Sequence, residues 1–391
     1  MYVNRVQFFA PGFSVNESNG VANIIVVREG ITTAPASVEY TTSDGSATQK
    51  GDYIITAGRL NFAPGETSKS FPVLIVDDVF QEGFETLNLT LSNPVGTTLG
   101  ATNTATLGIS DNDFSPPTSN PIDDAGFFVR EHYLDFLHRE PDAPGLAFWT
   151  DQITSCGSNP ACIEIRRINV SAAFFLSIEF QETGYLVERM YKVAYGDATG
   201  TSTFPGPGSH QLAVPIIRRS EFIPDSFQIS NGVIIGQPGA MQLLEANKVA
   251  FANDFVTRTR FITAYPTSLT PAQFVDALIA KAAFTPTAAE RQAFIDQFGG
   301  AGNTTDTAAR ARAVRAIAEN GTFSQLEKNK AFVLMQFFGY LRRDPDTNPD
   351  TDYTGYDFWL GKLNQFNGNF VSAEMVKAFI VSDEYRHRFG P

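Results

Sequence analysis

The feature that most constrains the fold is a series of short apolar runs in the first 113 residues. These runs are rich in β-branched and aromatic residues and are bounded by turn sequences such as SNG, SDGS and APGE. This pattern is typical of short β-strands. The clearest runs are residues 21–27, 36–42, 70–76 and 85–91. Their regular spacing predicts an all-β, two-sheet sandwich over residues 1–113.

The pattern changes after Asp111. The segment DNDFSPPTSNPIDD is polar and rich in proline, which predicts a linker over residues 114–126. Beyond it, VREHYLDFLHRE places Val129, Tyr133 and Phe136 at helical spacing, and similar stretches continue to the end. We therefore predict a multidomain chain with a mostly α-helical region at 127–391. Within it, Thr270 and Thr287 are expected helix starts, and residues 196–239, rich in Gly, Pro and Ser, are expected to be irregular.

An internal repeat is predicted in the helical region, with copies at about 127–190 and 327–391. HYLDFLHREPDAPGLAFW and QFFGYLRRDPDTNPDTDYTGYDFW each end at one of the two tryptophans of the chain, Trp149 and Trp359. Downstream, VSAAFFLSIEF matches MVKAFIVSDEY. Shared positions at one spacing are typical of duplicated units.

Acidic residues follow the predicted strands of the first region. Asp77 and Asp78 come directly after SFPVLIV, Glu82 and Glu85 lie a few residues on, and Asp111 follows the last strand. Calcium prefers six to eight oxygen ligands. Carboxylates packed together repel one another unless a cation is present. A calcium site is the expected interpretation; the alternative is that these aspartates only cap turns.

Residues 6–113 resemble the Calx-beta family. The resemblance rests on FSVNESNGVANIIVVR, VEYTTSDGSATQKGDY, GRLNFAPGETSKSFPVLIVDD, QEGFETLNLTLSNP and ISDND. It implies an immunoglobulin-like sandwich that binds Ca²⁺ at one end, and we expect one or two ions. The ligands that it implies are Glu17, Asp52, Asp77, Asp78, Glu82, Glu85, Asp111 and Asp113, with the main-chain carbonyl of Val79 as a further candidate.

The helical repeat resembles a bacterial domain of unknown function, family 4214, found in secreted and surface proteins. The closing SDEYRHRFG is similar to the helical domains of phycobilisome linker proteins. Neither resemblance implies a catalytic residue, so we interpret the shared positions as structural. They are Arg139, Asp142, Gly145, Trp149, Ser177 and Phe180 in the first copy, and Arg343, Asp346, Gly355, Trp359, Ser382 and Tyr385 in the second.

Two further motifs leave alternatives open. Cys156 and Cys162, in CGSNPAC, either close a disulfide suited to an oxidising compartment or remain free thiols. Alternating acidic residues from Asp344 to Asp352 resemble a calcium loop, but they lack the central Gly and final Glu of an EF-hand. A solvated acidic loop is the favoured interpretation of that second motif.

Composition narrows the function classes. A net charge of −13 argues against a nucleic-acid partner, and no apolar run is long enough for a transmembrane segment. No signal-peptide pattern is visible, and no nucleophile elbow, P-loop or metalloprotease motif occurs, so we expect no enzyme. We expect a bacterial, extracellular or cell-surface calcium-binding structural or adhesive protein. Its sandwich would act as a calcium-stiffened spacer, and its helical domain would contact a protein or glycan or self-associate. The alternatives are a subunit of a self-assembling surface layer or filament and, third, an enzyme acting on extracellular glycans.

Overall fold

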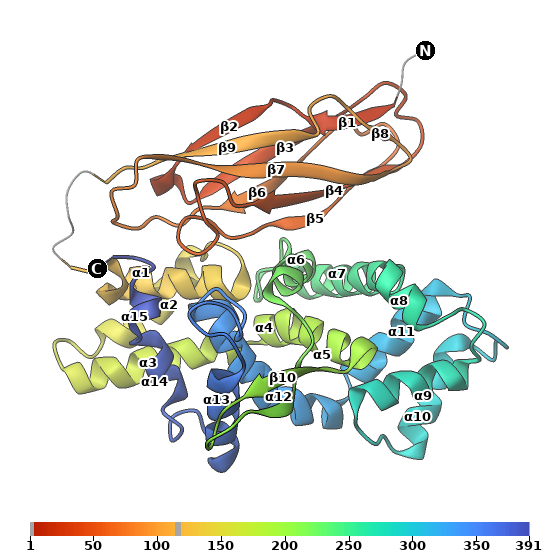
Figure 1. Ribbon diagram of the computed structural model, residues 1–391. Coiled ribbons are helices and arrows are strands. Elements are labelled where there is room, and N and C mark those ends of the chain that lie inside the picture. Colours follow the sequence, from red (N-terminus) through yellow and green to blue (C-terminus); the bar gives the residue numbers. More distant parts are fainter. Residues whose placement is uncertain (1–3, 114–118, 391) are drawn as a thin grey trace. The chain divides into compact units, whose positions relative to one another are not determined.

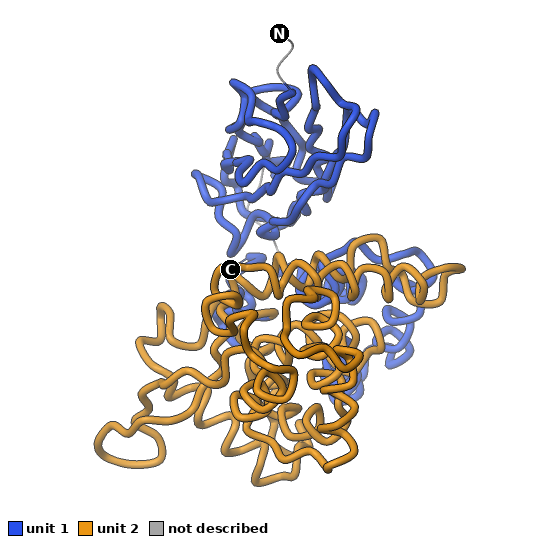
Figure 2. Tube along the Cα trace, turned by 90° about the vertical axis from the view of Figure 1, so that its right-hand side faces the viewer, with its two compact units in different colours: residues 1–174, 340–342, 378–391 blue, residues 175–339, 343–377 orange. Residues whose placement is uncertain are grey.

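The computed structural model describes residues 4–113 and 119–390. The chain divides into two compact units (Figure 2). Unit 1 comprises residues 1–174, 340–342 and 378–391, and unit 2 comprises residues 175–339 and 343–377. Across the described parts of both units, every helix is too short or too polar to cross a membrane.

The first part of unit 1 is the predicted β-sandwich, drawn in red to orange in Figure 1. One sheet has the strand order β6-β3-β1-β8 and the other β2-β9-β7-β4-β5. Each predicted run of the sequence forms a strand, which confirms the all-β expectation. The strands are β1 Arg5–Phe8, β2 Gly12–Asn16, β3 Val21–Glu29, β4 Ala36–Ser43, β5 Ala57–Phe62, β6 Ser68–Leu74, β7 Phe84–Val95, β8 Thr98–Leu99 and β9 Thr104–Ser110.

The sandwich core follows from the alternation of apolar and polar residues along each strand. In β4, Val38 and Tyr40 are buried while the residues between them are more exposed. The Tyr40 ring stacks on Phe71 of the other sheet with centroids 3.8 Å apart. Such contacts between the inner faces hold the two sheets together and leave the strand ends free to carry polar loops.

The helical part of unit 1 begins earlier than predicted. The side chain of Asp124 accepts a hydrogen bond from the backbone N–H of Phe127, and this N-cap starts α1 at Ala125, inside the predicted linker. A 3₁₀ turn precedes it at Pro121–Asp123, whereas residues 114–118 of that linker lie outside the described residues. The elements are η2 Pro121–Asp123, α1 Ala125–His132, η3 Tyr133–Leu137, α2 Ala143–Thr154, α3 Pro160–Leu176, whose last two residues belong to unit 2, and α15 Asp383–Arg386.

Unit 2 is mostly helical. Thr270 and Thr287 start α9 and α10 through reciprocal capping boxes, as predicted. The expectation of an irregular segment at 196–239 was wrong, because it contains an antiparallel hairpin and one helix. The elements are α4 Ile178–Glu182, α5 Gly184–Tyr195, β10 Asp197–Ser202, β11 His210–Pro215, α6 Arg219–Ser230, α7 Ala240–Phe255, α8 Thr259–Ala264, α9 Pro271–Ala282, α10 Ala288–Ile295, η4 Asp296–Phe298, α11 Thr307–Ala318, α12 Gly321–Met335, η5 Gln336–Tyr340 and α13 Thr354–Gln365. Helix α14 Met375–Ile380 spans the boundary between the units.

The two segments predicted as repeat copies share local geometry. Both η3 and η5 are π-helical turns, and each is followed within two residues by a residue of positive φ, His138 at 53° and Arg342 at 49°. Ser177 and Ser382 each cap a short helix through the side-chain oxygen. The copies differ where the second has extra residues: Asp142 caps α2, whereas Asp346 pairs with Arg218. The repeat itself stays a prediction.

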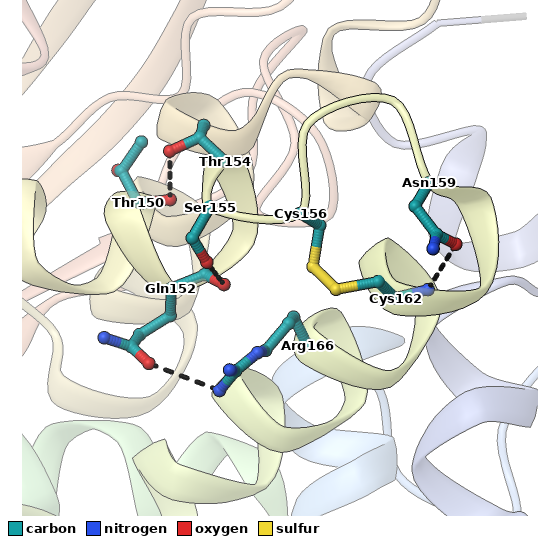
Figure 3. The surroundings of a disulfide bond; sticks show 8 residues. All are labelled: Thr150, Gln152, Thr154, Ser155, Cys156, Asn159, Cys162 and Arg166. Atoms are coloured by element: carbon teal, nitrogen blue, oxygen red, sulfur yellow. Dashed lines mark hydrogen bonds between the residues drawn. A yellow bond between two sulfur atoms is a disulfide. The ribbon is translucent and has the colours of Figure 1, made fainter.

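A disulfide joins Cys156 to Cys162 between α2 and α3, with the Cα atoms 5.6 Å apart (Figure 3). The loop is also held by the side chain of Asn159, which accepts a hydrogen bond from the N–H of Cys162. The sequence left open whether these cysteines form a disulfide or remain free thiols, and in the structure they form the disulfide.

Candidate metal centre

Strand register brings the predicted ligands together at one end of the sandwich. Strands β2 and β9 run parallel and pair Asn16 with Ser110, while β7 begins at Phe84 opposite Ser110. The segments that carry Glu17, Glu85 and Asp111 are therefore adjacent. The end of β6 pairs with the start of β3, directly after the turn that contains Glu17. That pairing brings the residues after β6, Asp77 and Asp78, to the same place.

The carboxylates form two groups. Oxygen atoms of Glu17, Asp77 and Asp113 lie within 4.8 Å of one another, and so do those of Asp52, Asp78 and Glu82. Glu85 extends the second group because its side chain hydrogen-bonds Asp52. We call these residues, with Asp111, the acidic end. All eight carboxylates predicted as ligands belong to it.

Backbone donors fix the positions of several of these side chains. The N–H of Asp78 donates to Glu17 Oε1 at 2.9 Å and so joins the two groups. Asp111 accepts the N–H groups of Glu82 and Gly83 through Oδ2, each at 2.8 Å. Its other oxygen, Oδ1, accepts the N–H of Asp113 at 2.6 Å. These bonds hold the loop before β7 against the residues after β9.

Burial and mutual repulsion oppose ionisation in the acidic end. Burial raises the pKa of Asp78 to about 9, with added repulsion from Glu82, Glu17 and Asp52. Burial, followed by neighbouring carboxylates, also raises the pKa values of Glu17, Glu82 and Glu85 to about 7. That of Asp113 is raised too. The neighbours responsible are acidic, so the charges are not matched within the cluster.

Asp111 is the exception. Burial opposes its ionisation, but the backbone N–H groups of Gly83, Asp113 and Glu82 outweigh it and hold its pKa below the usual value. These backbone donors thus favour the ionised form of Asp111, which is the form that can bind a metal ion.

The donor set fits calcium. Ca²⁺ takes hard oxygen ligands in flexible geometry, and the site offers two groups of three carboxylates with Glu85 and Asp111 beside them. Within the described residues, Asp113 Oδ2 is buried with no hydrogen-bond partner. A buried acceptor of this kind normally has a partner, which a cation would supply. The predicted ligation by the Val79 carbonyl, in the same loop, stays a prediction.

Two neighbouring polar residues have structural roles. Asp44 accepts hydrogen bonds from the Tyr53 hydroxyl at 2.7 Å and from the Gln49 N–H at 2.9 Å. Asn112 lies between Asp111 and Asp113 and carries no charge. Its side chain accepts the N–H of Ser18 and donates to Asp77 at 3.3 Å, which links two loops of the acidic end. The sequence signal for it was its place between two ligand positions, in DND.

The acidic loop of unit 2 is different. Asp344 and Asp346 pair with Arg218 at 3.3 and 2.7 Å, and Asp350 pairs with Arg343 at 2.8 Å. In this loop, arginine side chains therefore neutralise the carboxylates that would bind the ion in a calcium loop. The calcium-loop interpretation is not supported, and ion pairs hold the loop.

A two-sheet sandwich with a carboxylate cluster at one end defines a class of cation-binding β-modules. Residues 2–113 match the family model of the Calx-beta domain, so this part of the chain is a Calx-beta domain. It is 37% identical over 108 residues to the sodium/calcium exchanger Calx of Drosophila melanogaster, covering 27% of this chain and 11% of that protein. It is 36% identical over 115 residues to integrin beta-4 of Rattus norvegicus, covering 28% and 6%.

Solved structures match the same part of the chain. The apo-form Calx CBD1 domain is 35% identical, covering 28% of this chain and 99% of that one, with a TM-score of 0.28. The calcium binding domain CBD12 of CALX1.1 is 37% identical, covering 28% and 46%, with a TM-score of 0.27. The chain spans only about a tenth or less of the curated relatives' own length.

Proposed function

We propose that the acidic end binds one or two calcium ions. The observation that carries this proposal is the convergence of eight carboxylates at one end of the sandwich. Burial and neighbouring carboxylates raise the pKa values of five of them, Glu17, Asp78, Glu82, Glu85 and Asp113. A divalent cation would replace the protons that the cluster otherwise retains. Glu17, Asp77 and Asp113 would hold one ion, and Asp52, Asp78 and Glu82 the other. The printed title of a solved relative, a calcium binding domain, supports this proposal.

We further propose an extracellular structural or adhesive role without catalysis. The relatives include an integrin and an adhesion G-protein coupled receptor, and the disulfide suits an oxidising compartment. The sandwich would serve as a spacer that calcium stiffens, since Asp111 and Asp113 directly precede the predicted linker. The helical region, as a duplicated unit of the family-4214 type, would contact a protein or glycan.

Calcium titration by calorimetry tests the site. We expect saturable binding to the wild type and at least about 100-fold weaker binding to D77N/D78N, which removes one charge from each group. The control is E29Q, because Glu29 pairs with Arg5 on the exposed part of β3 and should leave affinity unchanged. Absence of binding at millimolar calcium, or equal affinity in D77N/D78N, would contradict the proposal. Scattering profiles that coincide with calcium and with chelator would contradict the stiffening alone.

A further inference from the structure

The two ends of the helical region contact each other within unit 1. The side-chain amide of Asn120 donates to the carbonyl oxygens of Gly390 at 2.8 Å and Arg386 at 3.1 Å. Arg386 returns a bidentate ion pair to Asp123, at 2.7 and 2.9 Å. The residues where the chain enters the helical region are therefore bonded directly to those near its far end.

A buried ion cluster lies behind these contacts. Asp135 receives two hydrogen bonds from Arg388, at 2.9 and 3.0 Å, and one from Arg342 at 3.0 Å. Arg388 also donates to the carbonyl of Tyr340 at 2.9 Å. The side chains of the three charged residues are at most 2% exposed. Three segments far apart in sequence thus share one set of charges.

The C-terminal segment cannot leave this cluster without a large cost. Burial alone would raise the pKa of Asp135, but Arg388 and Arg342 outweigh it and hold the pKa below the usual value. Removal of Arg388 would leave Asp135 with Arg342, and the fully buried Glu131 with Arg342 and the less buried Arg130. Loss of one partner from a buried pair is strongly destabilising, because it leaves a charge in a medium of low dielectric.

We propose that these contacts form a mechanical clasp, which we call the end clasp. It consists of Asn120, Asp123, Asp135, Arg342, Arg386 and Arg388. Since the two points where tension would enter the helical region are bonded neighbours, a load between them stretches the end clasp before it stretches any helix. The rest of the region would bear no load until the end clasp ruptures. An adhesive chain could then present its helical region while transmitting force past it.

Single-molecule force spectroscopy on the full chain, held at its two ends, tests this. The helical region is recognised by its contour length of about 90 nm, against roughly 40 nm for the sandwich. In the wild type we expect that length to appear only after a single rupture. At constant force, R388M should shorten the lifetime before rupture by about 100-fold.

A matched control separates the end clasp from general stability. The control variant R258M lies in unit 2. It removes another bidentate ion pair, that of Arg258 with the buried Asp225, whose two hydrogen bonds are 2.7 and 2.8 Å long. This variant should be less resistant to denaturant yet change the lifetime before the first rupture less than about threefold. A second variant, N120A/R386A, leaves the buried cluster intact and should shorten the lifetime about tenfold. An unchanged lifetime in N120A/R386A, or an equal loss in R258M, would overturn the proposal.

Discussion

The two charged regions of unit 1 treat the same residue types in opposite ways. Eight of the twelve acidic residues in the first 113 gather at the acidic end. There burial and neighbouring carboxylates raise the pKa of Asp78 to about 9. In the helical part, Asp135 is equally buried, but Arg388 and Arg342 hold its pKa below the usual value.

This contrast separates a cluster in which arginines face the carboxylates from one in which carboxylates face each other. The helical cluster supplies its own cations from distant segments, although burial and Asp135 still raise the pKa of Glu131 to about 7. The acidic end concentrates like charges that self-repulsion would otherwise disperse, and such an arrangement persists in folded proteins where an ion uses it. The number of acidic residues in a stretch of sequence does not distinguish these two kinds of cluster. The side chains that lie next to each carboxylate do.

The largest expected effect comes from removing one charge from each region. R388M should lower the free energy of unfolding by about 3–5 kcal/mol, since it leaves Asp135 partly uncompensated. D78N, measured in chelator at pH 8, should instead raise stability by roughly 1 kcal/mol or more, because one pKa unit corresponds to about 1.4 kcal/mol. Urea denaturation of both variants checks this. A D78N variant less stable than wild type in chelator would break the comparison.

Calcium should stabilise one region only. At a free concentration of 100 times the dissociation constant, it should add about 2.7 kcal/mol to the sandwich. Both tryptophans lie in the helical region, so a thermal transition that changes their fluorescence belongs to that region. A transition that leaves their fluorescence unchanged belongs to the sandwich. Calorimetric scans with calcium and with chelator should show only the sandwich transition rising. Magnesium is the control; an equal shift with magnesium would argue against a calcium-selective site.

The smallest expected effect is a pH dependence of stability that differs between the two regions on the acid side. A carboxyl whose pKa is raised by folding binds its proton more tightly when folded, so its stabilisation is lost as pH rises. In chelator the sandwich should therefore lose stability between about pH 4.5 and 7 through Glu17, Glu82 and Glu85, and toward pH 9 through Asp78. Saturating calcium should flatten this slope.

The helical region should respond on the acid side. Asp123 and Asp135 have lowered pKa values because arginines face them, so their stabilisation is present above the unfolded pKa and lost as pH falls below about 4. Thermal scans from pH 3 to 9, read by tryptophan fluorescence for this region, measure it. Burial raises the pKa values of Glu131 and Glu188 to about 7 and 8, so these two residues should add a loss of stability as pH rises through that range. A helical transition that did not fall below pH 4 would contradict the assignment of Asp123 and Asp135.

Much of the sandwich could be predicted because its information is local. Runs such as 36–42 carry both strand propensity and a period of two, and Asp77, Asp78 and Asp111 stand directly after strands. The hairpin formed by β10 and β11 was missed, because DATGTS has few apolar residues and its pairing with HQLAVP is a tertiary choice. The early start of α1 depends on one cap, Asp124, in a segment whose composition resembles a linker.

The sequence by itself determined the two kinds of region, because strand period, turn residues and helix caps act over a few positions. The eight candidate ligands came from the resemblance to the Calx-beta family together with the acidic residues that follow the strands. Only the tertiary structure decided how the ligands divide into two groups. It also paired Arg388 with Asp135 across 253 positions of sequence and matched Asp346 with Arg218. Charge pairing depends on distance in space, and residues remote in sequence become neighbours only when packing places them together.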